Sequence, residues 1–290
     1  LSHTRPAMYA TLMGNAINVV LNYFLIFGFW IFPKMGVEGA ALGTLISRIA
    51  MLLFMGLYVR YNKRFISFAQ NIVFKKPNWN LFKKIIRLGF PSALQMFFEV
   101  VFFTAAIWLS GFLGKNSQAA NQIALNLSSM TFMFAMGLGV TAMIRVGNQK
   151  GKNDYEALKR IAYSIFLLMF VFDVLFCLFF LLTNNYLPWI YLDGSNPLQI
   201  SDVTQVVKLA STLLIVSAFF QISDGIQAVV LGALRGLQDV NIPAFIIFFA
   251  YGIFGLPISF YLGLHTSLGA TGIWIGLLSG LTVSAILLLI

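Results

Sequence analysis

Eight long apolar stretches separated by shorter polar links dominate the hydrophobic pattern of this chain. They cover about residues 6–32, 36–60, 88–113, 119–144, 161–183, 205–234, 242–264 and 269–290. A helix needs roughly 20 apolar residues to cross a bilayer, and each stretch is long enough. Backbone groups in lipid must be satisfied within the element, and the alternation expected of outer-membrane strands is missing. The pattern predicts an all-α integral membrane protein with about eight transmembrane helices.

The composition excludes a soluble enzyme and a soluble binding module. Of the 290 residues, 59% are hydrophobic and 10% are charged, and the mean hydropathy is +0.87. A soluble domain carries about 25% charged residues, so this chain cannot cover a soluble surface. With one cysteine and two distant histidines, neither a disulfide nor a metal cluster is expected. No nucleophile, base and orienting residue gather in the sequence, so we expect neither an enzyme nor a cofactor.

The basic residues are distributed unevenly over the links. If every stretch spans, fifteen of the 19 Lys and Arg residues lie on one side and three on the other. The basic side is cytoplasmic by the positive-inside rule, which predicts a multi-pass plasma (inner) membrane protein. The same asymmetry explains the net charge of +10 without a nucleic-acid partner. The link from Arg145 to Arg160 is expected to be a cytoplasmic loop.

The first two apolar stretches resemble the last two, which indicates an internal repeat. The matching positions are Pro6 and Pro243, Asn22 and Ser259, and the glycines Gly36, Gly39 and Gly43 with Gly269, Gly272 and Gly276. Four stretches precede the second copy and none precedes the first. We therefore expect a twelve-helix protein of two six-helix bundles, in which about four helices precede this chain. Residues 1–62 would end the first bundle, 63–84 would form a basic cytoplasmic linker, and 85–290 would form the second bundle.

Four ionisable residues interrupt the apolar stretches: Arg48, Glu99, Asp173 and Asp224. Each costs roughly 2.5–3.5 kcal/mol at a helix centre, so such residues indicate function by default. Glu99 follows Gln95 by one turn, and Asp224 has Gln221 and Gln227 three residues to either side.

Oxygen ligands of this kind suit Na⁺ or a proton. Glu99 and Asp224 therefore either bind a cation, with Na⁺ as a possible metal ligand set, or form hydrogen-bonded bridges between helices. Gln122 and Asn126, one turn apart with Asn121 beside them, are either site residues or amide contacts between helices. Asp173, with only apolar neighbours, is either a structural partner or part of a relay.

Several segments of the chain form a further pattern. They are Leu88–Gln95 followed by Phe98 and Glu99, Ala119–Asn126, Arg145–Asn148, Gln221–Asp224 with Gly232–Gly236, and Thr4–Tyr9. In order and spacing they resemble the multidrug and toxic compound extrusion (MATE) family, in its NorM-like branch. The resemblance covers nearly the whole chain and implies helices 5–12 of a twelve-helix transporter.

The resemblance implies a secondary active antiporter that exports cationic amphipathic drugs in exchange for Na⁺ or H⁺. It implies Glu99 and Asp224 as cation-coupling carboxylates. Phe103 and Gln122 match positions that line the family's substrate cavity, and we expect Gln95, Asn126 and Phe220 to line it with them. Phe220 stands where relatives often have a tyrosine, so one hydroxyl ligand is lost. The expected partners are small cationic organic substrates and the lipid bilayer, and the expected state is a monomer. The alternatives are a lipid-linked oligosaccharide flippase of the same superfamily and a membrane scaffold without transport.

Overall fold

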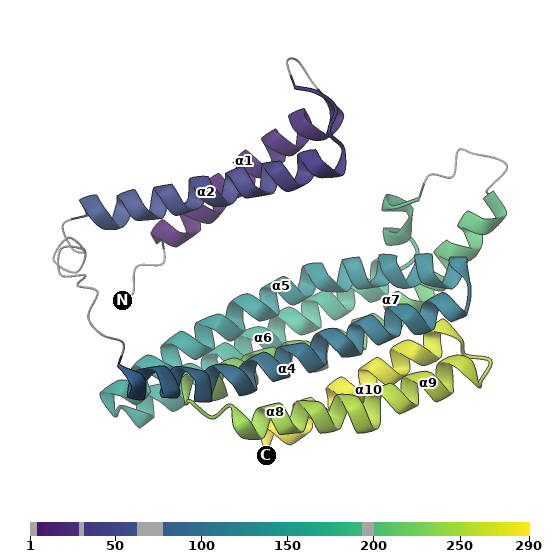
Figure 1. Cartoon of the computed structure of the whole chain (residues 1–290). Coiled ribbons are helices and arrows are strands. Elements are labelled where there is room, and N and C mark those ends of the chain that lie inside the picture. The colour runs from purple at the N-terminus through teal and green to yellow at the C-terminus, as the bar shows by residue number, and fades with distance from the viewer. Residues whose placement is uncertain (1–4, 29–31, 63–77, 193–199) are drawn as a thin grey trace. The chain divides into compact units, whose positions relative to one another are not determined.

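The computed structural model describes residues 5–28, 32–62, 78–192 and 200–290, and helices account for nearly all of them (Figure 1). Eight helices in this described part are long and apolar enough to cross a membrane, judged by length and composition. The predicted all-α membrane class is therefore confirmed. The helices divide into two compact units, Leu1–Pro77 and Asn78–Ile290.

The first unit is a helical hairpin made of α1 (Arg5–Phe27) and α2 (Val37–Tyr61). Asn18 on α1 donates a hydrogen bond from Nδ2 to Oγ1 of Thr44 on α2 at 3.3 Å, and Asn22 donates to Asn18 at 3.2 Å. A Cβ placed on Gly43 would meet Oδ1 of Asn22. These asparagines therefore lie against α2, where they help to hold the hairpin together.

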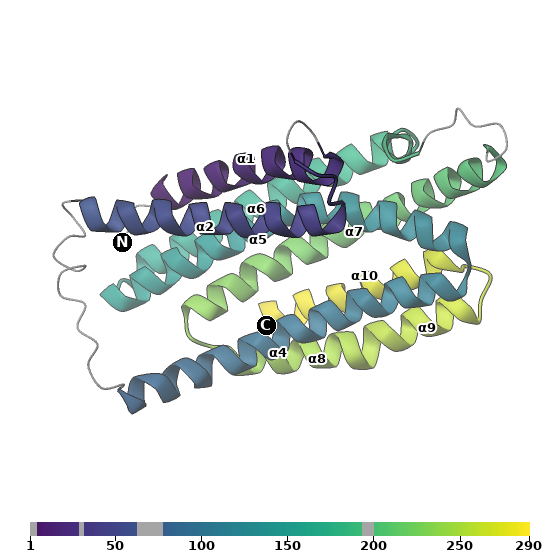
Figure 2. The same ribbon diagram turned by 45° about the horizontal axis from the view of Figure 1, so that its top comes forward.

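The second unit is a bundle of six spans in which α7 is central. Helix α7 packs against α5, α6 and α10, while α4 packs against α5, α8 and α10 (Figure 2). The elements are α4 (Trp79–Phe112), α5 (Lys115–Lys152), α6 (Tyr155–Thr183), the 3₁₀ turn η1 (Leu187–Ile190), α7 (Ile200–Gly236), α8 (Asn241–Phe248), the π-helical η2 (Phe249–Gly255), α9 (Leu256–Leu264) and α10 (Ala270–Leu289).

The seventh span is continuous from Asn241 to Leu264 but changes its helical winding in the middle. Pro257 has no backbone N–H, so the carbonyl four residues before it loses its α-helical partner. The π-helical η2 directly precedes this proline. Local π winding is one way in which a membrane helix accommodates a proline without leaving its backbone unsatisfied.

Several helices extend further than their apolar stretches predicted. Helix α4 already begins at Trp79, where Asn78 caps it by accepting from the backbone N–H of Asn80 at 3.1 Å. Residues 79–84 of the expected linker are thus helical, and 63–77 lie outside the described residues. The prediction of a loop from Arg145 to Arg160 is wrong, because only a two-residue turn at Asn153 and Asp154 separates α5 from α6. Hydropathy detects the lipid-buried part of a helix and misses charged turns that continue into water.

The internal repeat extends from the sequence to the packing of the helices. Gly36 and Gly269 precede the second helix of each pair with nearly equal backbone angles, φ 56° and ψ −123° against φ 53° and ψ −128°. A Cβ on Gly39 would lie 2.6 Å from the carbonyl oxygen of Leu25, and one on Gly272 would meet the carbonyl oxygen of Leu262. Leu25 and Leu262 are themselves equivalent in the repeat, so both pairs make the same close backbone contact.

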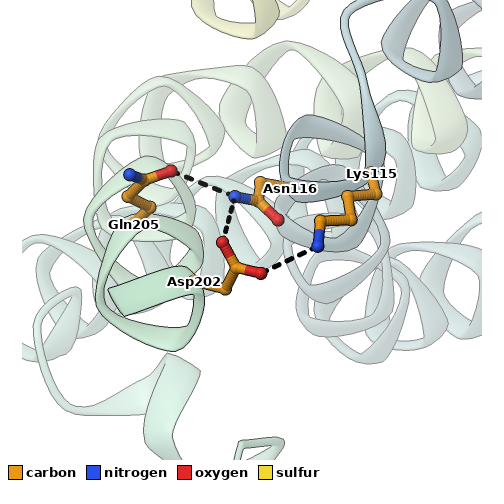
Figure 3. A network of polar contacts seen from close by, with 4 residues as sticks. All are labelled: Lys115, Asn116, Asp202 and Gln205. Atoms are coloured by element: carbon orange, nitrogen blue, oxygen red, sulfur yellow. Dashed lines mark hydrogen bonds and ion pairs between the residues drawn. The ribbon is translucent and has the colours of Figure 1, made fainter. Parts of the chain in front are cut away.

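A polar network joins the beginning of α5 to the beginning of α7. Lys115 Nζ lies 2.8 Å from Oδ2 of Asp202, and Asn116 donates to Gln205 Oε1 at 3.0 Å and to Asp202 Oδ1 at 3.4 Å (Figure 3). The ion pair is exposed, so it contributes little to stability. Its place is at one end of the bundle, away from the polar residues in the interior.

Candidate cation and substrate site

A partly open cavity of about 100 Å³ lies between α4, α5 and α7; we call it the α4–α7 cavity. Its wall includes Met96, Met136 and Met143 together with Phe132, and its charged residues are Glu99 and Arg235. Glycines bring α5 and α7 together at its base. A Cβ on Gly139 would lie 2.7 Å from the carbonyl oxygen of Ala228, and one on Gly232 would overlap the backbone of Gly139.

Glu99 and Arg235 face this cavity from opposite helices. Gln95, one turn before Glu99 on α4, is buried and accepts a hydrogen bond from Nη2 of Arg235 at 3.1 Å. The charges of Glu99 and Arg235 act on one another, but the two side chains form no ion pair within 4.0 Å. The carboxylate of Glu99 therefore keeps its oxygens available to a ligand in the cavity.

Asp224 lies deeper in the bundle than Glu99. It is 5% exposed, and its Oδ1 has no hydrogen-bond partner within the described part of the chain. Gln221, one turn earlier on α7, is equally buried, and neither of its amide atoms has a partner there. The negative charges of Glu99 and Asp173 both act on Asp224. The fold thus brings acidic groups from α4, α6 and α7 near each other.

A second polar group links α7 to the two last spans. Gln227 donates from Nε2 to the hydroxyl of Tyr251 in η2 at 2.6 Å, and Ser284 on α10 donates to Oε1 of Gln227. The ring of Tyr251 stacks on Phe102 with centroids 4.3 Å apart. Asn121 accepts from Nε1 of Trp274 at 2.9 Å. These buried hydrogen bonds join different helices, which fits a role in fixing helix positions, although Nδ2 of Asn121 has no partner within the described residues.

Four of the predicted substrate-cavity residues lie elsewhere in the second unit. Gln122 and Asn126 share an exposed face of α5, and Asn126 donates to the backbone carbonyl of Gln122 at 3.0 Å. Phe220 is 2% exposed, and its ring lies 5.9 Å from that of Phe103 and 5.5 Å from that of Trp274. None of these four residues lines the α4–α7 cavity, whereas Gln95 lies next to it through Arg235.

The sequence reasoning missed several residues that the structure places in the cavity wall. The three methionines are individually unremarkable in an apolar helix, so nothing in the sequence marked them. Arg235 is one of the fifteen basic residues on the predicted cytoplasmic side, but it is half-buried beside Gln95. Its position near the end of α7, eleven residues after Asp224, was the signal that could have found it.

The described residues contain no group of three or more His, Cys, Asp or Glu side chains arranged to hold a metal ion. A divalent-metal centre of that kind is therefore not indicated there. Paired carboxylates with amide and hydroxyl oxygens are compatible with a weakly bound monovalent cation.

Fold and site together define a polytopic helical membrane protein with charged residues enclosed in its bundle. A family model, MatE, matches residues 91–261, and the chain belongs to this family. The chain is 34% identical to a probable multidrug resistance protein NorM of Pasteurella multocida over 296 residues and 35% identical to multidrug resistance protein MdtK of Photorhabdus laumondii over 292 residues. The alignments cover 100% and 99% of the chain but 62% of each relative. The chain thus spans about 60% of the length of the curated relatives it matches.

Solved structures show the same fold. The crystal structure of the eukaryotic MATE transporter AtDTX14 matches with a TM-score of 0.82 at 23% identity, over 98% of this chain and 60% of that one. An outward-facing multidrug resistance MATE family transporter of the MOP superfamily also matches with a TM-score of 0.82, at 18% identity, over 97% and 60%. These transporters have a twelve-helix fold, so the expected architecture is confirmed.

Proposed function

We propose that the whole protein, including any residues beyond this chain, is a secondary active antiporter that exports cationic amphipathic drugs in exchange for Na⁺ or H⁺. The observation that carries the proposal is the α4–α7 cavity, which combines an apolar wall with the carboxylate of Glu99, whose charge acts on the buried Asp224. The names of the two relatives, both multidrug resistance proteins, support the same class of substrate.

The methionine wall supports a broad range of drugs. Met96, Met136 and Met143 are each between 36% and 51% exposed, and all three line the cavity. Methionine is unbranched and polarisable, so it can repack around ligands of different shape. Flexible methionine-rich surfaces are a known route to promiscuous binding. A ring such as Phe132, in the same wall, offers a face to a planar cation.

The charges favour a cationic substrate over an anionic one. Near the cavity, three acidic residues, Glu99, Asp173 and Asp224, outnumber one basic residue, Arg235, which donates to Gln95. A flippase for an anionic, lipid-linked sugar needs a basic lining, and the described wall offers a single guanidinium. Gln122, Asn126, Phe103 and Phe220 stay proposed substrate contacts, although they lie outside this cavity.

In the proposed mechanism, the cation and the drug exclude each other. A cation bound at Glu99 and Asp224 neutralises the charge that attracts the drug, so its arrival releases the drug and its departure restores the site. Exchange requires that each ligand binds the two facing states of the transporter with different affinity. We infer rocking of two bundles about a central site, with the basic links in the cytoplasm and a monomer in the plasma membrane.

The test follows the movement of ethidium into proteoliposomes that contain the whole protein. A Na⁺ gradient and then a pH gradient are imposed on the wild type and on Glu99→Gln. The proposal predicts uphill ethidium movement under one of the gradients and its loss in Glu99→Gln. Asp202→Asn, which removes the exposed carboxylate at the centre of the network in Figure 3, is the matched control and should transport normally.

No ethidium movement in the wild type under either gradient would contradict the antiporter proposal. Normal movement in Glu99→Gln would show that this carboxylate does not couple the ion. A Glu99→Gln protein that no longer folds, with a wild type that transports, would support the view that Glu99 is a structural bridge between helices.

A further inference from the structure

A small cavity of about 10 Å³ lies between α5, α6 and α7, apart from the larger α4–α7 cavity. We call it the inner cavity. Helix α5 contributes Thr131 and Phe132, α6 contributes Asp173, and α7 contributes Gln221 and Asp224. Phe132 lines both cavities, so one ring lies between them. The polar residues of the inner cavity belong to helices that are almost entirely apolar at this depth.

Asp173 reaches the inner cavity because α7 has a glycine opposite it. Asp173 is 1% exposed, and a Cβ built on Gly225 would meet both of its carboxylate oxygens and would lie 2.6 Å from Cε of Met169. The carboxylate therefore lies directly against the backbone of α7, next in sequence to Asp224. A residue with any larger side chain at position 225 would force Asp173 to move.

Several polar atoms in the inner cavity lack hydrogen-bond partners. Asp173 Oδ2, Asp224 Oδ1 and both amide atoms of Gln221 are buried with no hydrogen-bond partner within the described residues. Thr131 donates its hydroxyl hydrogen to the carbonyl of Ser128 at 2.8 Å, so its oxygen keeps a free lone pair toward the cavity. Buried polar groups are ordinarily paired, and a buried charge without a partner is especially costly.

No fixed positive charge neutralises the two aspartates. Among the described residues, the ion pair within 4.0 Å is that of Lys115 and Asp202, at the end of the bundle. The side chains that α5 contributes to the cavity are not titratable. Toward Asp224, α4 presents the acidic Glu99 and η2 the hydroxyl of Tyr251, while α6 places Cys177 one turn after Asp173. Arg235 is three turns further along α7 and donates to Gln95.

We propose that Asp173 is a second acidic ligand for the coupling cation, which it holds together with Asp224 in the inner cavity. The ligand is a single positive charge, either Na⁺ or a proton. Gln221 and Thr131 supply the neutral oxygens that Na⁺ would require, and the two carboxylates alone suffice to share a proton. This inference rests on the proposed antiport, and it adds a helix, α6, to the elements that respond to the cation.

The first test compares transport by variants of the whole protein in proteoliposomes. Asp173→Asn keeps the size of the side chain and removes one acidic ligand. Gly225→Ala keeps the carboxylate but displaces it. The controls are Asp154→Asn, which preserves the side-chain cap of the same helix, and Gly137→Ala on α5, where a Cβ would meet nothing within 4 Å.

If Na⁺ is the coupling ion, the half-saturating Na⁺ concentration should rise roughly ten-fold or more in both test variants. If the ion is a proton, the pH of half-maximal flux should move to more acid values by about one unit, because the remaining carboxylate loses a negative neighbour. Both controls should behave as the wild type. Wild-type ion dependence in both test variants would overturn the inference while leaving the antiport intact.

The second test needs no variant, so it does not depend on folding of the mutants. Dicyclohexylcarbodiimide reacts with protonated carboxyl groups in apolar surroundings, and mass spectrometry locates its adducts. The inference predicts that added Na⁺, or a rise in pH if the ion is a proton, protects Asp173 and Asp224 with the same midpoint. Labelling of Asp173 that is indifferent to both would overturn it. A wild type without gradient-driven flux would instead refute the antiport proposal.

Discussion

At the scale of single residues, we expect the hydroxyl of Tyr251 to stabilise the folded bundle through one buried hydrogen bond. Tyr251→Phe keeps the ring that stacks on Phe102 but leaves Nε2 of the buried Gln227 without its acceptor. An unsatisfied buried donor costs about 1–3 kcal/mol. We expect a lower midpoint of thermal unfolding in detergent, measured by intrinsic fluorescence.

The control for this prediction is Tyr261→Phe in the same span. Tyr261 is 62% exposed and stacks on His265, a contact that phenylalanine preserves. Its midpoint should stay at the wild-type value. If Tyr251→Phe also unfolds at the wild-type temperature, the hydrogen bond from Gln227 does not stabilise the bundle.

The sequence was most informative where a residue conflicts with its surroundings. Glu99 and Asp224 interrupt apolar stretches, so they could be singled out without a structure. That Asp173 lies against Gly225 could not be predicted, because the register of α6 against α7 depends on packing across two helices. Similarly, spacing placed Gln122 and Asn126 on one face of a helix, but it could not tell that this face is exposed in the second unit.

At the scale of helices, the close backbone contact within each repeat should be intolerant of a single added methyl group. In Gly39→Ala the new Cβ would lie 2.6 Å from the carbonyl oxygen of Leu25. Overpacking of this kind costs about 1–3 kcal/mol. We expect a lower unfolding midpoint for Gly39→Ala, and likewise for the equivalent Gly272→Ala.

Gly56→Ala on the same helix as Gly39 is the matched control, because its Cβ would meet nothing within 4 Å. Alanine favours a helix over glycine by about 1 kcal/mol, so this variant should unfold at or above the wild-type temperature. Equal midpoints for Gly39→Ala and Gly56→Ala would contradict the packing role of the repeat glycines.

Hydropathy located all eight spans but misplaced several of their ends. The helical turns at Trp79–Arg87 and at Arg145–Lys152 carry charged residues, so the apolar signal stops before the helix does. The repeat was readable because the glycine spacing survives in both copies, and small residues such as glycine allow two helix backbones to approach closely. Existence and order of the helices follow from burial in lipid, whereas their ends depend on capping and on contacts in water.

At the scale of the whole molecule, the proposed antiport requires that drug and cation exclude each other. Thermodynamic linkage makes such exclusion reciprocal: if the cation weakens binding of the drug, the drug weakens binding of the cation by the same factor. Ion-driven drug movement therefore implies drug-driven ion movement, through the same carboxylates.

The most direct measurement starts from proteoliposomes with equal Na⁺ and equal pH on both sides. A cationic drug such as ethidium is added to one side, and movement of Na⁺ is followed with a radioactive tracer while internal pH is followed with a dye. The proposed antiport predicts that the drug drives one of the two cations in the opposite direction, and that Glu99→Gln abolishes this movement. Drug uptake without any movement of either cation would contradict it.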